Sequence, residues 1–129
     1  LYLQGNGWGI VNQSFEDVPQ STEQILHPER YISGEAPVTV ELPEFAAVLG
    51  EGWTELRRDT LGELFILAYL EADVTPKQAL VDADGWGGDI YALLKGPERD
   101  NLLVSVITWD AANDTREFFD TFFGFMETR

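Results

Sequence analysis

The chain has 129 residues, of which 44% are hydrophobic and 24% charged, and this composition indicates one globular domain rather than a disordered segment. Its formal net charge of −15 repels phosphates and anionic lipid, which excludes nucleic acid as a partner. No apolar run approaches the roughly 18 residues of a membrane span, so we expect no membrane insertion by this domain. The lack of cysteine excludes disulfides, thiolate metal sites and cysteine nucleophiles.

The first 36 residues predict an arm of loop and helix. The start, Leu1 to Gly5, lacks both the basic and the apolar region of a signal peptide. It is either the remnant of a cleavable tag or the native end of an upstream helix, and we favour the second. Residues 5–9 predict a glycine-rich turn that carries Trp8 and, without a following lysine, is no phosphate loop. Ser21 and Gln24 predict a capping box.

Residues 37–129 predict a core of sheet and helices. Residues 37–43 alternate apolar and polar side chains between two prolines, which predicts a short edge strand. One helical turn is expected at 44–49 and a weaker strand at 53–59. Thr60 and Glu63 form a second capping box, which predicts a buried helix over 61–71.

The second half of the core has the strongest signals. Thr75 and Pro76 are typical of a helix start, and Gly85 predicts a left-handed residue just past the end of that helix. Strands are predicted over 89–95 and 102–109 with a turn-rich loop between them, as in a hairpin.

A final helix is predicted over 111–126, with Asp110 as its cap. One broad apolar stripe runs along it, which we expect in the core with Phe122 in the interface with the sheet; its members are Phe118, Phe119, Phe122, Phe123 and Met126. The Phe122→Ala change should then cost on the order of 3 to 5 kcal/mol.

The order of these elements predicts a single α+β domain with a small antiparallel sheet and helices packed on one face. From residue 53 onward the series is βαββα, the half of a ferredoxin-like fold that one more strand would complete. Either the chain was truncated before that strand, or residues 38–42 fill the vacant edge of the sheet.

The segment 82–89 places three carboxylates among glycines, as calcium loops do. It fails the EF-hand template, because Trp86 and Leu93 stand where ligands are required. Asp82, Asp84 and Asp89 are therefore weak candidates for a metal site. The stronger interpretation is a helix end followed by a glycine turn around Trp86.

His27 is the only histidine of the chain, so a usual zinc site cannot be built here. It stands four residues after Glu23, and this pair is a candidate for facing a cleft. No serine lies in a Gly-x-Ser-x-Gly elbow, and we expect no catalytic residue and no cofactor. Trp8 and Trp86 sit in glycine turns and are candidates for ligand or partner contact, whereas Trp109 is expected in the core.

Several runs together resemble one family: Gln20–Tyr31, Leu49–Trp53, Asp59–Glu63, Gly85–Leu93 and Thr108–Asp110. They are similar to the C-terminal part of a family of uncharacterised exported proteins in bacteria and halophilic archaea. Tyr2, Gly7-Trp8 and Val11-Asn12 also match that family, which favours a native start. The family's upstream region is similar to a zinc peptidase with a His-Glu-x-x-His motif, none of which is in this sequence.

The resemblance implies a C-terminal domain in the extracellular space or cell envelope, with the upstream domain of the same polypeptide as its partner. We expect a non-catalytic accessory or binding domain. The alternative is the substrate-side wall of a metallopeptidase-like enzyme whose catalytic motif lies upstream.

Overall fold

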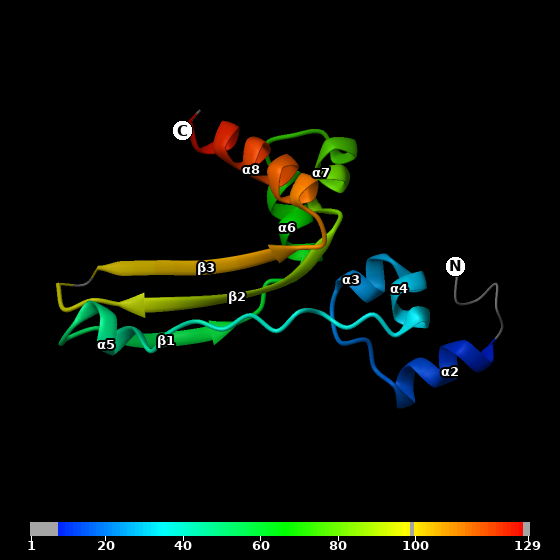
Figure 1. Ribbon diagram of the computed structural model, residues 1–129, viewed down its shortest axis with the longest axis horizontal. Helices are drawn as coiled ribbons and strands as arrows, with labels where there is room; N and C mark the ends of the chain where they lie inside the picture. Colours follow the sequence, from blue (N-terminus) through cyan, green and yellow to red (C-terminus); the bar gives the residue numbers. More distant parts are fainter. Residues whose placement is uncertain (1–7, 99, 128–129) are drawn as a thin grey trace. The chain divides into compact units, whose positions relative to one another are not determined.

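The computed structural model describes residues 8–98 and 100–127 (Figure 1). The chain divides into two compact units, with the boundary between Pro37 and Val38. The expectations for residues 1–7 lie outside the described part. Within that part, no helix is long and apolar enough to cross a bilayer.

Unit 1 contains three helices among its described residues: α2 (Trp8–Glu16), α3 (Glu23–Leu26) and α4 (Pro28–Ser33). The prediction of a turn at Trp8 is wrong, because Trp8 opens α2, which the sequence analysis did not anticipate. Gln24 N donates to Ser21 Oγ at 3.3 Å, as the capping box predicts. The helical conformation ends at His27 (φ −118°, ψ 80°), directly before Pro28, so α3 is a single turn.

Unit 2 contains the sheet and the remaining helices. Its elements are α5 (Phe45–Leu49), β1 (Thr54–Asp59), α6 (Glu63–Leu70), α7 (Pro76–Ala83), β2 (Trp86–Lys95), β3 (Asn101–Trp109) and α8 (Ala112–Glu127). The strands form an antiparallel sheet in the order β1-β2-β3 (Figure 1). The predicted α+β class and the βαββα order are therefore confirmed.

The β2–β3 hairpin is confirmed, with a register that runs from Trp86 opposite Trp109 to Lys95 opposite Asn101. The helix end and glycine turn predicted before Trp86 are confirmed, with a turn at 84–85 in which Gly85 has a φ of 78°, and β2 begins at Trp86 itself. A register shift between Trp86 and Gly88 marks a bulge. At Gly88 a Cβ atom would collide with the carbonyl oxygen of Val38, so the glycine serves a close approach of two backbones.

The edge strand predicted over 37–43 is wrong. The segment runs extended beside the start of β2, but only Val38 N bonds to it, at 2.7 Å from Gly87 O. The two prolines that bound the segment have no N–H to contribute to a ladder. Arg58 holds the far end instead, donating to the carbonyl of Leu42 at 3.0 Å.

The sheet buries one face under α5 and the extended segment before it. The core of this face consists of Phe45, Ala92 and Leu94, and the half-buried residues packed against it are Leu42, Leu49, Trp53, Leu102 and Val104. Since Ala92 pairs with Val104 and Leu94 with Leu102, the alternation of the two strands places all four on this face.

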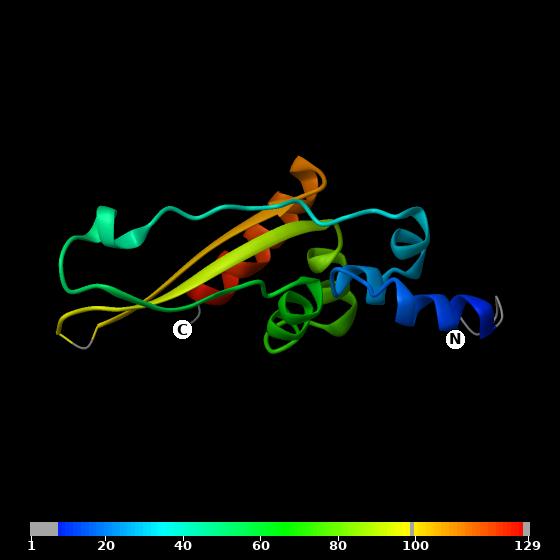
Figure 2. The same ribbon diagram turned by 90° about the horizontal axis from the view of Figure 1, so that it is seen from below.

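The opposite face of the sheet carries α6 and α8. Figure 2 shows the extended segment before α5 on one side of the strands and α6 on the other. The prediction that the aromatic stripe of α8 lies in the core is wrong, because Phe119 and Phe123 are 51% and 48% exposed. Phe125, outside the predicted stripe, is the buried residue of the helix at 6%. The C-terminal end of α8 lies away from β3 (Figure 1), and the stripe borders an open cavity between α8, β3 and α6.

Candidate functional site

An open cavity of about 490 Å³ lies between β3, α6 and α8, and we call it the aromatic groove. Its lining residues are Leu61, Phe65, Ile66, Tyr69, Leu103, Ser105, Ile107, Trp109, Thr115, Phe118, Phe119, Phe122 and Phe123. Its size falls within the range of roughly 300 to 1,000 Å³ that is usual for sites of small ligands.

The wall of the groove on α8 is a continuous series of stacked rings. Trp109, the last residue of β3, lies 4.9 Å from Phe118 between ring centroids. Phe118 stacks on Phe122 at 5.5 Å, and Phe122 reaches Tyr69 of α6 at 6.2 Å. Offset and tilted ring pairs at these distances attract one another beyond simple burial. The series therefore connects the sheet to α6 along one side of the groove.

The floor of the groove follows from the alternation of β3. Leu103, Ser105, Ile107 and Trp109 are two residues apart, so their side chains share the face turned away from Leu94. Because Leu102, Val104 and Val106 on the other face of β3 are also apolar, the strand needs cover on both faces, and α6 and α8 cover the groove face only in part.

The groove is apolar and accessible. None of its thirteen lining residues is charged, although 24% of the chain is. Phe65 and Leu103 are 53% and 61% exposed, so large apolar side chains face solvent here. The polar side chains of the lining are those of Tyr69, Ser105 and Thr115, and a ligand would find hydroxyl groups but no ion-pair partner.

A buried carboxylate sets the position of α6 beside the groove. Asp89 of β2 accepts from Leu61 N and Gly62 N, each at 2.8 Å, and from the indole N–H of Trp86 at 3.1 Å. The capping box predicted at Thr60 is wrong, because Gly62 stands at the N-cap of α6 and the Thr60 hydroxyl donates to the carbonyl of Asp89 at 3.2 Å. Asp89 therefore anchors the two residues that lead into α6 to β2.

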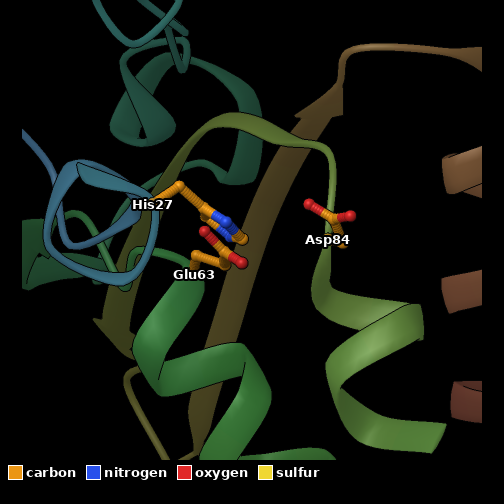
Figure 3. A group of neighbouring side chains, drawn as sticks. All are labelled: His27, Glu63 and Asp84. Carbon is orange, nitrogen blue, oxygen red and sulfur yellow. The ribbon is translucent and has the colours of Figure 1, made fainter. Parts of the chain in front are cut away.

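The three carboxylates considered for calcium have separate surroundings. Asp82 is 1% exposed and accepts from Gln78 Nε2 at 2.8 Å and Thr121 Oγ1 at 2.6 Å. Asp84 lies at the end of α7 and accepts from Gly85 N at 3.0 Å; Figure 3 shows this position, and Glu63 on the first turn of α6. Among the described residues, the ligand atoms of Asp82, Asp84 and Asp89 do not gather within 4.8 Å of one another.

The other candidate residues are dispersed. In unit 1, Glu23 is 2% exposed and its carboxylate forms an ion pair with Arg30, so it does not face open solvent. His27 Nδ1 lies 3.8 Å from Glu29 Oε1. Trp8 is 69% exposed, which leaves it available for contact.

Trp86 is 1% exposed, so its predicted exposure is wrong. The bulge at the start of β2 turns its ring inward, where its N–H meets the carboxylate of Asp89. Trp109, predicted in the core, is half-buried and lines the groove.

Sequence reasoning did not identify the groove. The signal that was present is the composition of β3, in which apolar residues occupy both faces, together with a helix whose apolar stripe is wider than one contact needs. The apolar surface on the two faces of β3 and on α8 is larger than the area that the other described elements cover.

The comparisons with known proteins identify one family. The family described as Domain of unknown function (DUF8575) matches residues 48–129, which include α6, α8 and the whole sheet. No curated protein and no solved structure matches the chain significantly.

Proposed function

We propose that this chain, which belongs to the family Domain of unknown function (DUF8575), is a non-catalytic binding domain that takes up an uncharged apolar group in the aromatic groove. The observation that carries the proposal is the composition of the lining, with seven aromatic side chains and no charged one among thirteen residues. On a chain with a net charge of −15, such a region lets an apolar ligand displace water without desolvating a charge.

The exposed rings give the proposal its energetic basis. Covering apolar surface contributes roughly 25 cal/mol per Å², and Phe65, Phe119 and Phe123 each have about half of their surface open. Large apolar patches that remain open on a protein surface commonly mark binding sites. The stacked rings of α8 are held by one another before any ligand arrives, which lowers the ordering cost of binding.

A titration with N-phenyl-1-naphthylamine tests this function, because the probe is apolar, uncharged and fluorescent when it leaves water. We expect saturable binding, and we expect Phe119→Asp to weaken it at least about tenfold by placing a carboxylate in the groove. Phe15→Asp is the matched control, since Phe15 is an exposed phenylalanine of unit 1. Equal binding by the two variants would contradict the proposed site.

We propose further that the chain is the C-terminal part of an exported protein and works beside an upstream domain in the extracellular space or cell envelope. The resemblance of runs such as Gln20–Tyr31 to an exported family supports this context. The coding sequence of the full-length gene tests it, and a gene without an export or lipoprotein signal would contradict it. The same resemblance supports an upstream domain similar to a zinc metallopeptidase, for which zinc analysis of the full-length protein is the test.

A further inference from the structure

The floor of the aromatic groove carries one hydroxyl group among apolar side chains. On the groove face of β3, Ser105 lies between Leu103 and Ile107. Its partner in the register is Tyr91 of β2, whose side chain shares that face of the sheet. Within the part of the chain that the structure describes, no hydrogen bond joins the Ser105 hydroxyl to another group. Ser105 is exposed, so water satisfies its hydroxyl while the groove is open.

The two other hydroxyl groups of the lining are in a different position. Thr115 Oγ1 already donates to the carbonyl of Ala111 at 3.4 Å. Tyr69 packs its ring against Phe122 and is 39% exposed, and a long side chain of this kind keeps its hydroxyl at the tip in water while its ring is covered. The short side chain of Ser105 cannot reach past a ligand, so Ser105 is the hydroxyl that a ligand in the groove would cover.

This hydroxyl restricts the chemistry of the ligand. A hydrocarbon that fills the groove would leave the Ser105 hydroxyl buried without a partner, whereas a ligand hydroxyl placed beside it restores the hydrogen bond that water provided. A charged ligand is disfavoured, because the lining contains no charged side chain to pair with it. An anion is also repelled by the net charge of −15. The complementary ligand is therefore neutral and carries a hydroxyl group.

We propose that the aromatic groove binds a neutral aromatic alcohol, with Ser105 as the residue that selects for its hydroxyl group. A serine hydroxyl both donates and accepts, so it pairs with an alcohol in either direction. The ring system of the ligand packs on Phe119 and Phe123, which stack at 4.2 Å and have about half of their surface open, because offset and edge-on contacts favour a ring over an alkyl chain there. The inference rests on the proposed function of the groove and names the class of its ligand.

Equilibrium dialysis of the full chain against naphthalene, 2-naphthol and 2-naphthoate tests the inference, because the three probes share one ring system. At pH 7 the first has no polar group, the second a neutral hydroxyl and the third a negative charge. Transfer from water alone favours naphthalene, since it has no polar group to desolvate. We expect instead that 2-naphthol binds at least about fivefold more tightly than naphthalene, and 2-naphthoate at least about tenfold more weakly than 2-naphthol.

The ratio of the affinities for 2-naphthol and naphthalene is the readout for the variants, because a general change in the groove alters the binding of both probes. Ser105→Ala should abolish the preference for 2-naphthol, and Ser105→Thr, which keeps a hydroxyl group, should retain it. Thr115→Val is the matched control, because it removes a groove hydroxyl that is already bonded to Ala111. Tyr69→Phe removes the hydroxyl that stays in water, and both changes should leave the ratio unchanged.

Equal binding of 2-naphthol and naphthalene by the unaltered protein would overturn the inference. So would a preference that survives in Ser105→Ala or that is lost equally in Thr115→Val. If N-phenyl-1-naphthylamine binds in the groove and 2-naphthol is not preferred over naphthalene, the inference is wrong while the proposed function stands. If neither N-phenyl-1-naphthylamine nor any of the three probes binds, both are wrong.

Discussion

The indole N–H of Trp86 donates to Oδ1 of Asp89 at 3.1 Å, and both side chains are buried in unit 2. The same carboxylate receives the N–H groups of Leu61 and Gly62. The Gly-Trp-Gly-Gly-Asp run therefore connects the bulge of β2 to the start of α6. Because α6 forms one wall of the aromatic groove, this connection fixes the width of the proposed site.

Replacing Asp89 with alanine should strongly destabilise unit 2. Three N–H groups would lose their acceptor in a buried place, and each unsatisfied group costs roughly 1 to 3 kcal/mol. We expect a loss of about 3 to 5 kcal/mol in the free energy of unfolding, measured by urea unfolding. Asp89→Asn, which keeps one acceptor oxygen, should fall in between. The exposed Asp120→Ala on α8 should change little, and an equally small effect of Asp89→Ala would refute the anchoring role of Asp89.

Two phenylalanines of α8 should differ in their contribution to stability. Phe125 is 6% exposed and meets Tyr69 edge-on at 5.3 Å, so Phe125→Ala should cost about 3 to 5 kcal/mol. Phe122 is half-buried beside the groove, and Phe122→Ala should cost only about 1 to 2 kcal/mol. Thermal or urea unfolding of the pair distinguishes these values. If Phe122→Ala were the more destabilising change, Phe122 and the aromatic stripe around it would be buried in solution.

Two glycine-to-alanine changes should have opposite signs. In α8 a Cβ at Gly124 meets nothing within 4 Å, and alanine favours a helix by about 0.5 to 1 kcal/mol over glycine. At Gly88 the added Cβ would collide with the carbonyl of Val38, so that variant should be destabilised and should release the segment before α5. Hydrogen exchange at the Val38 amide reports the release. A Gly88→Ala protein with normal protection there would show that the two backbones are not in contact.

The ion pair between Glu55 and Arg58 should make stability depend on pH in the acid range. The hydrogen bond from Arg58 is the main cause that lowers the pKa of Glu55, with a further contribution from its charge. A lowered folded-state pKa means that the stabilisation is present above the ordinary glutamate pKa and is lost as the pH falls through the folded-state value. Glu55→Gln should therefore lower the urea midpoint at pH 7, and this difference from the wild type should become smaller as the pH is lowered toward about 3.

The exposed Glu98→Gln change is the control for this experiment. It should leave the midpoint unchanged at both pH values. A difference between wild type and Glu55→Gln that persists undiminished at the lower pH would show that the pair contributes through something other than the charge of Glu55.

Much of unit 2 could be predicted because its signals are local. Thr75 accepts from Gln78 N at 3.3 Å and Pro76 opens α7, as the capping pattern indicates. Gly85 has a φ of 78°, the left-handed value expected past a helix end. The two short apolar runs, the second rich in β-branched residues, and the turn-rich loop between them likewise identify the hairpin, because these signals lie within the segment itself.

The rest depends on contacts between distant positions. No residue near Thr60 in the sequence indicates that Asp89, and not Thr60, accepts from the N–H group of Gly62. Asp89 reaches that N–H group only through the packing of β2 beside the segment that precedes α6. The stripe of α8 has the pattern of a core helix whether or not the sheet covers it. Burial of Phe125 and exposure of Phe119 follow from the angle at which α8 leaves β3, which no local pattern determines.

The indole N–H signals of the four tryptophans provide the most direct test of ligand binding in the aromatic groove. In ¹H–¹⁵N spectra recorded during a titration with N-phenyl-1-naphthylamine, we predict that the Trp109 signal shifts in a saturable way, because Trp109 lines the groove. The signal of Trp86, held by Asp89, and that of Trp8 in unit 1 should stay in place. A titration in which Trp8 shifts and Trp109 does not would contradict the account.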